Sequence, residues 1–281
     1  MRLNPTENMM ALSISDFKKT TATTPPRILI YGPPGIGKTT LAAEFPNAAF
    51  LQIEDGTPGD VELMSFGQIT SFATLMEGLA VLYTEDHEFK TVVIDSVTEL
   101  ERLVFAETCA RGDDKGNSKA NIEDFGYGKG YVYAKRVWQE VIDGINALRR
   151  DRGLTTILIA HSSVERFDDP ETVSYDRYEI DLHKHSVGAI EREMDCIFLL
   201  KSPVNIAKEE QGFNKERAIA GGSSVVLIHT VGRPAFIAKN RYSMPATVRF
   251  DKGKGYAALA SYFPGHEAPA PVAVETKKKA A

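Results

Sequence analysis

Residues 27–43, RILIYGPPGIGKTTLAA, combine three features whose order restricts the fold of the whole chain. The apolar run RILIYG has the length and composition of a buried β-strand. A glycine-rich loop follows this run, and the residues after the loop suit a helix. Gly32, four further residues and then Gly37-Lys38-Thr39 have the spacing of a phosphate-binding loop (P-loop), which requires a strand before it and a helix after it. The sequence therefore predicts an α/β domain built around this loop.

Each part of the predicted loop has a defined role in binding phosphate. Glycines allow backbone N–H groups to turn inward around phosphate oxygens, and the N-terminus of the next helix adds partial positive charge. We expect Lys38 to reach the β- and γ-phosphates and the hydroxyl of Thr39 to bind Mg²⁺. The residues predicted to bind the nucleotide are Gly32, Pro33, Pro34, Gly35, Ile36, Gly37, Lys38, Thr39 and Thr40.

Apolar runs and helix-like segments alternate along most of the chain. After the first strand, β-type runs lie at 48–54, 91–95, 155–161, 195–200, 223–230, 234–239 and 246–250. Helix-like sequence lies around 70–83, from 96 onward and at 133–150. This alternation predicts a mainly parallel sheet covered by helices on both faces. The last runs follow one another without helices, which predicts an antiparallel extension at one edge.

Composition and charge restrict the class of protein. The chain has 281 residues, of which 43% are hydrophobic and 25% charged, as expected for a globular protein with one large domain. The net charge of −5 means that any contact with nucleic acid has to be local. Cys109 and Cys196 lack metal-ligand spacing and favour a reducing cytoplasm. No apolar run reaches the roughly 18 residues of a membrane span, so no membrane partner is expected.

The two ends of the chain differ in composition from its middle. We divide the chain into an N-terminal segment (1–24), a core (25–263) and an Ala/Pro segment with three consecutive lysines (264–281). The composition of the last segment predicts disorder.

Asp95 is the first candidate metal ligand outside the loop. The run TVVID delivers its carboxylate to the end of a strand, where ligands bind in open α/β sheets. A carboxylate at this place would hold Mg²⁺ through water. The alternative is that Asp95 caps the helix that begins at Ser96 or Val97.

Hydrolysis of a nucleotide also needs a group that activates water. Glu54 closes the run after the P-loop helix and is expected at the same edge of the sheet as Asp95. A carboxylate there could polarise a water in line with the γ-phosphate. Glu99, one turn into the next helix, is the competing candidate, and Glu54 could instead only begin a turn.

Together these motifs resemble the core of RecA-like ATPases. More narrowly, the chain resembles the compact phage-encoded RecA-like ATPases known as phage nucleotide-binding proteins, some of which are single-strand annealing recombinases. The resemblance covers residues 25–250 and rests on Glu54 combined with Asp95-Ser96 as well as on the P-loop. It implies ATP and Mg²⁺ as ligands, DNA-stimulated ATP hydrolysis, assembly into a ring or filament, and a location in the cytoplasm of a bacterial host.

The resemblance also implies roles for individual residues. Glu54 matches the catalytic glutamate and Asp95 the metal-binding carboxylate. His161 stands where relatives have a polar sensor, commonly glutamine, so a histidine departs from the pattern. Lys239 and Arg241 in AKNR look like the Lys-x-Arg pair with which replicative helicases complete a neighbour's catalytic site. The alternative for this pair is a solvated strand end.

Two long segments are candidates for DNA contact. Segment 111–136 is rich in glycine and interleaves lysines, which could follow phosphates, with aromatic residues, which could stack on bases. Segment 162–188 occupies the place of the second DNA loop in RecA relatives, but its many carboxylates weaken that interpretation. The predicted DNA contacts are Lys115, Lys119, Lys129 and Lys184.

Three functions remain open from the sequence. The first is an ATPase acting on single-stranded DNA in recombination or replication, with a single-strand-binding protein as a further partner. The second is a P-loop switch or motor subunit that has a protein partner and no contact with DNA. The third is a small-molecule kinase, which is disfavoured because no compact arginine-rich lid is visible.

Overall fold

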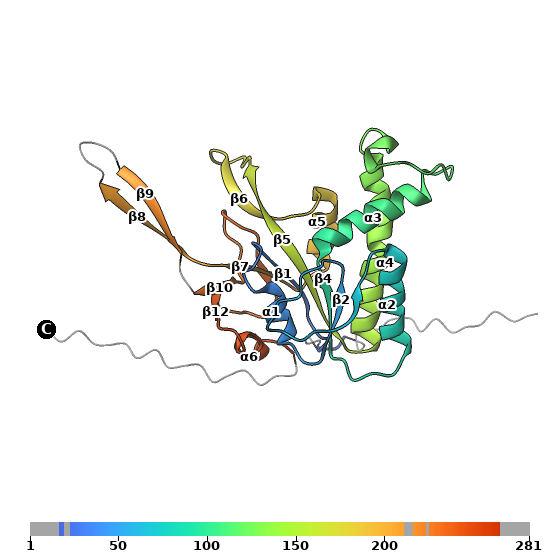
Figure 1. The fold of residues 1–281 in the computed structure, drawn as a ribbon, viewed down its shortest axis with the longest axis horizontal. Helices are drawn as coiled ribbons and strands as arrows, with labels where there is room; N and C mark the ends of the chain where they lie inside the picture. Colours follow the sequence, from blue (N-terminus) through green and yellow to red (C-terminus); the bar gives the residue numbers. More distant parts are fainter. Residues whose placement is uncertain (1–16, 20–22, 211–215, 223–224, 265–281) are drawn as a thin grey trace, which may run out of the picture.

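The computed structural model describes residues 17–19, 23–210, 216–222 and 225–264 (Figure 1). Most of the N-terminal segment 1–24 and of the Ala/Pro segment 264–281 lies outside these residues. The prediction of disorder for the latter therefore stays a prediction.

A ten-stranded sheet occupies the centre of the described part of the chain. Its strands are β1 (Arg27–Gly32), β2 (Ala48–Gln52), β3 (Met64–Gln68), β4 (Thr91–Asp95), β5 (Thr155–Phe167), β6 (Tyr175–Ile180), β7 (Cys196–Lys201), β10 (Val226–His229), β11 (Lys239–Asn240) and β12 (Thr247–Phe250). The main path has the order β12-β10-β7-β1-β5-β4-β2-β3. The strands from β7 to β3 in this order are parallel, whereas β10 is antiparallel to both β7 and β12. The predicted α/β class, with an antiparallel C-terminal extension, is confirmed.

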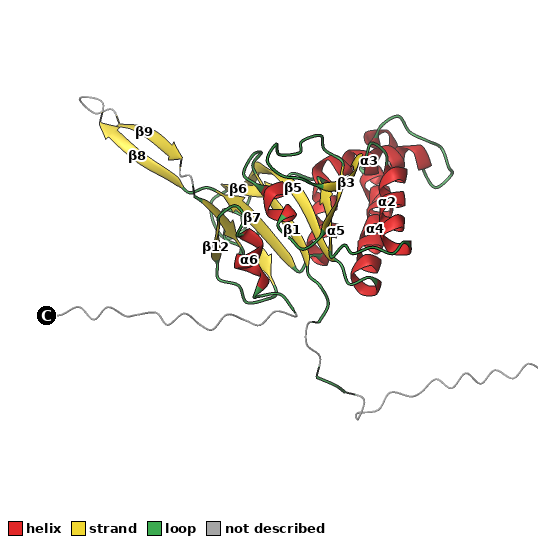
Figure 2. Ribbon diagram, turned by 60° about the horizontal axis from the view of Figure 1, so that its bottom comes forward, coloured by secondary structure: helices red, strands yellow, loops and turns green. Residues whose placement is uncertain are grey.

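Helices cover both faces of this sheet (Figure 2). They are α1 (Lys38–Ala43), α2 (Phe72–Thr84), α3 (Val97–Arg111), α4 (Lys129–Asp151), α5 (Lys184–Glu193) and α6 (Gly255–Ala260), with a short 3-10 helix, η2 (Ile122–Phe125). One hydrophobic core lies under α2, α3, α4 and α5, and the second lies under α1 and α6.

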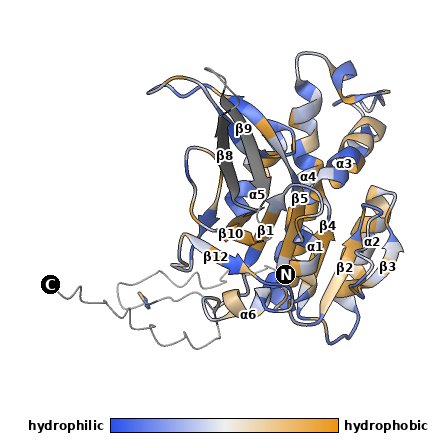
Figure 3. Ribbon diagram, turned by 60° about the vertical axis from the view of Figure 1, so that its left-hand side comes forward, coloured by the Kyte–Doolittle hydropathy of each residue, from blue (hydrophilic) through white to orange (hydrophobic). Residues whose placement is uncertain are grey.

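Alternating side chains of β1 enter the two cores. Leu29 and Tyr31 belong to the first core, and Ile28 and Ile30 belong to the second. All four side chains are fully buried, so the strand is apolar along its length rather than on alternate residues. The hydrophobic colouring of the central strands follows from this burial on both faces (Figure 3).

Segment 162–188, predicted as a loop, is mostly regular structure. β5 continues to Phe167 and pairs antiparallel with β6, and α5 begins at Lys184. The outer half of β5 is largely exposed, so no apolar alternation marks it as a strand in the sequence.

Other boundaries also differ from the prediction. α4 begins at Lys129 rather than at residue 133, which shortens the predicted loop 111–136. The predicted strand 234–239 is reduced to isolated bridges at Phe236 and the two-residue β11. Sequence patterns did not reveal β3, whose residues are all exposed.

A hairpin of β8 (Val204–Glu210) and β9 (Glu216–Gly222) projects away from the sheet (Figures 1 and 2). Its strands pair with each other in a separate two-stranded sheet. This hairpin was also absent from the prediction. Within the described part of the chain, none of the helices has the length and apolar character needed to cross a membrane.

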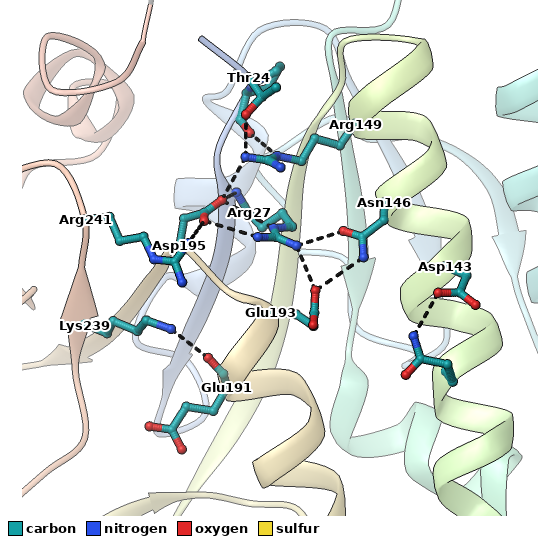
Figure 4. A network of polar contacts seen from close by, with 12 residues as sticks. Thr24, Arg27, Asp143, Asn146, Arg149, Glu191, Glu193, Asp195, Lys239 and Arg241 are labelled. Atoms are coloured by element: carbon teal, nitrogen blue, oxygen red, sulfur yellow. Dashed lines mark hydrogen bonds and ion pairs between the residues drawn. The ribbon is translucent and has the colours of Figure 1, made fainter. Parts of the chain in front are cut away.

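Asp195 organises a polar network at the amino-terminal edge of the sheet (Figure 4). Its side chain is 3% exposed and accepts hydrogen bonds from Arg27, Arg149 and Arg241 at donor–acceptor distances of 3.0 to 3.3 Å. Arg149 also donates to the hydroxyl of Thr24 at 2.6 Å. The network therefore fixes the start of β1 and the path of the chain that enters it.

Replacing Asp195 with alanine would leave three guanidinium groups without their buried anion. We expect the Asp195→Ala variant to lose about 3–5 kcal/mol of the free energy of unfolding, measured by urea denaturation. Arg241→Ala is the comparison, because its side chain is 54% exposed, and its loss should stay below about 1 kcal/mol. Equal losses in the two variants would contradict the central role of Asp195.

The same carboxylate makes stability depend on pH. Burial alone would raise the pKa of Asp195, but hydrogen bonds and charge from Arg27, together with the charge of Arg149, hold the pKa below its ordinary value. A depressed carboxyl pKa gives stability that is present above the unfolded-state pKa of about 3.9 and is lost as pH falls through the folded-state pKa. Denaturation below pH 4 should therefore show a smaller acid-induced loss in Asp195→Asn than in the wild type.

Candidate nucleotide-binding site

The P-loop joins β1 to α1, as the sequence predicts. Gly37 has a φ of 102°, in the left-handed region that favours glycine. A Cβ atom at Gly37 would lie 2.9 Å from the ring of Phe250, and one at Gly32 would lie 2.5 Å from the carbonyl oxygen of Leu200. Side chains at these two positions would clash with residues packed against the loop, so both positions require glycine.

Lys38 is buried at the start of α1, with an exposed fraction of 7%. Its ammonium group donates to the carbonyl oxygens of Gly32 at 3.0 Å and Pro33 at 3.1 Å. Burial lowers the pKa of Lys38, and the carboxylates of Asp95 and Glu54 oppose this change. A cation is therefore fixed inside the loop beside two anions.

Thr39 and Asp95, which the sequence predicts to bind the metal ion, contact each other. The hydroxyl of Thr39 donates to Oδ2 of Asp95 at 2.7 Å. Burial raises the pKa of Asp95, and this hydrogen bond opposes the rise. Ser96, not Asp95, caps α3, because its hydroxyl accepts from the backbone N–H of Glu99 at 3.3 Å. Two oxygen donors side by side suit Mg²⁺, which supports the metal-binding interpretation of Asp95 over the capping one.

Glu54 lies beside His161 at the same edge of the sheet. The backbone N–H of Glu54 donates to the carbonyl of Asp95 at 3.1 Å, which sets the segment after β2 against the end of β4. Nε2 of His161 lies 2.9 Å from a carboxylate oxygen of Glu54. The candidate water activator and the candidate sensor are therefore one contacting pair. Glu99, the competing candidate, instead pairs with Arg102 on the surface.

The surroundings of Glu54 keep it ionised at neutral pH. Burial alone would raise the pKa of Glu54, but hydrogen bonds with His161 and Ser96 outweigh burial and leave the pKa below its ordinary value. Nδ1 of His161 is buried and has no hydrogen-bond partner among the described residues. Among the described residues, the ring of His161 therefore makes hydrogen bonds to Glu54 through Nε2 only.

One cavity of about 510 Å³ is lined by the P-loop and these side chains, within the range of roughly 300–1,000 Å³ that is typical of small-molecule sites. Lys38, Thr39, Glu54, Asp95 and His161 all line this cavity. The structure therefore brings together five residues from four separate parts of the sequence.

Two charged residues that no sequence motif revealed, Asp60 and Lys252, also line the cavity. Asp60 lies in the segment after Glu54, Lys252 lies in the turn after β12, and their side chains form an ion pair. Both occur in polar, glycine-containing stretches that read as ordinary turns. No local signal could have linked them to the P-loop.

Lys239 and Arg241 lie away from this cavity. β11 pairs antiparallel with the start of β7, so the two cations are at the edge opposite the P-loop. The ammonium group of Lys239 donates to the carbonyl of Glu191 at 2.9 Å, and Arg241 pairs with Asp195 at 3.0 Å (Figure 4). Their action in a neighbouring subunit stays a prediction, and within their own subunit both are already engaged.

The predicted DNA-contacting lysines fall into two places. Lys115, Lys119 and Lys129 line a second cavity, of about 290 Å³, formed by the loop after α3 and the start of α4. Lys184 lines a different recess between β6 and α5. Three of the four predicted DNA-contacting lysines therefore lie together in the structure.

Comparison with known proteins places the chain in a family. A family model described as an AAA domain matches residues 24–242. The chain belongs to this AAA domain family. By fold it is a P-loop ATPase, and this implies a nucleotide as ligand. The matched range includes the P-loop, Glu54, Asp95 and His161 but ends before Lys252.

No curated protein sequence matches this AAA domain. Among solved structures it is similar to the RadB recombinase, with 13% identity, a TM-score of 0.42, and coverage of 82% of this chain and 90% of that chain. It is also similar to the flagellar accessory protein FlaH from Methanocaldococcus jannaschii, with 10% identity, a TM-score of 0.36, and coverage of 81% and 85%. Likenesses this distant add no functional assignment.

Lys38 should dominate nucleotide affinity. In Lys38→Ala we expect the dissociation constant for a fluorescent ATP analogue to rise about ten- to a hundredfold, because a buried hydrogen bond to a charged group is lost. Lys90→Ala removes the same charge from an exposed position at the opposite end of β4 and serves as the control. Equal affinity of the two variants would contradict the assignment of this cavity to the nucleotide.

Proposed function

We propose that the protein hydrolyses ATP with Mg²⁺ and acts on single-stranded DNA in recombination or replication. The observation that carries the hydrolysis is the ionised Glu54, held 2.9 Å from His161 in the cavity that Lys38, Thr39 and Asp95 also line. ATP is preferred to GTP because the sequence has no NKxD-type stretch for reading guanine.

Each residue of the cavity has a part in this reaction. Mg²⁺ bound at Thr39 and Asp95 would neutralise negative charge on the phosphate oxygens. Lys38 supplies a fixed positive charge at the loop. Glu54 accepts the proton of the attacking water as the water oxygen bonds to the γ-phosphorus and the bond to the bridging oxygen breaks. His161 positions the Glu54 carboxylate, and its own backbone N–H is fixed by the hydroxyl of Thr98 at 3.0 Å.

Charge in segment 111–136 supports contact with DNA phosphates. Its carboxylates are engaged within the segment: Asp113 with Lys119, Asp114 with Tyr133 and Arg136, Glu123 with Tyr131, and Asp124 with the backbone of Asn121. By contrast, the exposed ammonium groups of Lys115 and Lys129 have no hydrogen bond or ion pair with any described residue, and both line the same cavity. Two cations are therefore free to bind phosphate.

An aromatic side chain next to these lysines supports contact with bases. Tyr127 is fully exposed, with a relative exposure of 103%, and it stands between two glycines two residues before Lys129. Stacking of an unpaired base on such a ring is worth about 1–3 kcal/mol. The other aromatic residues of the segment pack within the protein, as Tyr131 does on the ring of His183 at a centroid distance of 3.8 Å.

The same ring contact joins the two candidate DNA segments and leads back to the ATP cavity. The backbone N–H of His183 donates to the carboxylate of Glu101 on α3, and that of Asp181 donates to the carbonyl of His161 at 3.0 Å. The stacked rings, the chain between His183 and Asp181, and the hydrogen bond to His161 therefore connect Tyr131 to the residue that positions Glu54. This supports stimulation of hydrolysis by DNA.

Assembly into a ring or filament belongs to the same proposal. A neighbour's Arg241 at the γ-phosphate would be worth roughly 10³- to 10⁵-fold in rate. Its partial exposure leaves it accessible, although it would have to leave Asp195. A phage origin, a bacterial cytoplasm and a single-strand-binding protein as partner follow from the resemblance alone and stay predictions.

A protein partner without DNA is the second candidate function. The exposed β5–β6 hairpin favours it, because the hairpin region is rich in carboxylates and exposes Val164 and Val173 by 61% and 83%. Such a surface repels DNA and suits a basic or apolar protein surface.

Glu54→Gln should separate binding from hydrolysis. We expect phosphate release to fall about 10²-fold or more, since a general base contributes about 10²–10⁴-fold, while the affinity for ATP changes little. Glu99→Gln, which alters a carboxylate of α3 outside the cavity, should keep its turnover. Loss of turnover in Glu99→Gln and not in Glu54→Gln would reverse the assignment.

The DNA contact can be tested through its dependence on salt. Replacing Lys115 and Lys129 together with alanine should weaken binding of a single-stranded oligonucleotide and reduce the slope of log K against log salt by about 1.4, since each phosphate contact contributes about 0.7. Lys135→Ala, an exposed lysine of the same segment outside the cavity, is the control. Turnover that single-stranded DNA leaves unchanged would instead favour the protein-partner function.

A further inference from the structure

Lys252 and Asp60 bring an opposite pair of charges to the ATP cavity. Lys252 belongs to the turn after β12, and Asp60 belongs to the segment that follows Glu54. Both line the cavity together with Lys38 and Thr39, and both are exposed. The pair therefore faces the same volume as the P-loop.

The turn that carries Lys252 is anchored to the P-loop helix. Glu44, directly after α1, accepts hydrogen bonds from the backbone N–H groups of Gly253 at 2.6 Å and Tyr256 at 3.1 Å. Phe250 packs against Gly37, where a Cβ atom would come within 2.9 Å of its ring. These contacts place Lys252 at the cavity independently of its pairing with Asp60.

The pairing with Asp60 is weak enough to be exchanged. The two side chains are 54% and 65% exposed, and an ion pair in water contributes little because both charges remain solvated. A phosphate group offers an ammonium a stronger, charge-assisted hydrogen bond. An anionic ligand in the cavity also repels the carboxylate of Asp60.

We propose that Lys252 binds the polyphosphate of the nucleotide held by the P-loop of the same subunit, and that Asp60 competes with the nucleotide for this ammonium group. Binding then exchanges one partner of Lys252 for another, and no covalent bond changes. Lys252 is a nucleotide-binding residue supplied in cis, distinct from the cations at Lys239 and Arg241. The inference rests on the proposed function only in requiring that the cavity binds ATP.

The two partners should have opposite effects on affinity. With the full chain and a fluorescent ATP analogue in Mg²⁺, we expect Lys252→Ala to raise the dissociation constant about tenfold, as for loss of a hydrogen bond to a charged group. Asp60→Asn should lower it about two- to fivefold, because a weak competitor of the exposed ion-pair type is removed. Asp60→Asn should raise affinity less in the Lys252→Ala background than in the wild type, since no ammonium group remains to be competed for and only the repulsion between Asp60 and the ligand is relieved.

Matched controls come from the same two segments. Lys254→Ala removes an exposed lysine of the same turn, and Glu62→Gln removes an exposed carboxylate near Asp60, and neither residue lines the cavity. Both should bind ATP as the wild type does. Lys252→Arg should restore affinity relative to Lys252→Ala, with circular dichroism confirming that every variant is folded.

The outcomes separate this inference from the proposed function. Opposite shifts in Lys252→Ala and Asp60→Asn support the exchange. Shifts in the same direction, or none in either variant while the wild type binds ATP, would overturn it and leave the pair as an ordinary surface contact. Absence of ATP binding by the wild type would overturn the proposed function and the inference together.

Discussion

The parallel register of β1, β4 and β5 brings the P-loop, Asp95 and His161 to the cavity of the candidate nucleotide-binding site. Gly32 is opposite His161 and Asp95 is opposite Ile159, so Gly32, Asp95 and His161 lie at one edge of the parallel part of the sheet. Contacts of 2.7 Å between Thr39 and Asp95 and of 2.9 Å between Glu54 and His161 follow from this common edge. A slip of one residue in any of the three strands would turn its side chains to the opposite face and separate the pairs.

How far the sequence predicts the site depends on how local each signal is. The positions of the P-loop, Asp95 and Glu54 are predictable because each lies at or just after the carboxyl end of a short apolar strand. The β5–β6 hairpin is not predictable, because most of its residues are half-buried or exposed and show no apolar period. The position of Lys252 is not predictable either, since it depends on two contacts between residues far apart in the sequence. These are the packing of Phe250 against Gly37 and the hydrogen bond from Gly253 to Glu44, and the residues around Lys252 give no sign of them.

Positively charged side chains lie at both the carboxyl and the amino edge of the sheet. At the carboxyl edge, Lys38 and Lys252 face the cavity, with the carboxylates of Glu54 and Asp95 beside them. At the amino edge, Arg27, Arg149 and Arg241 surround one buried carboxylate and hold the beginning of β1 in place. The motif AKNR predicts a contact with the catalytic site of a neighbouring subunit. In its own subunit, however, Arg241 pairs with Asp195, the carboxylate that also binds Arg27 at the start of β1.

The hydrogen bonds between the turn after β12 and Glu44, which follows α1, join parts of the chain that are synthesised at different times. Tyr256 and Glu44, which are joined by a backbone-to-carboxylate hydrogen bond, are 212 residues apart in the chain. During synthesis the P-loop leaves the ribosome well before Phe250 and the turn that complete its surroundings. A nascent chain therefore carries the phosphate-binding loop without these contacts until the turn after β12 has also been made.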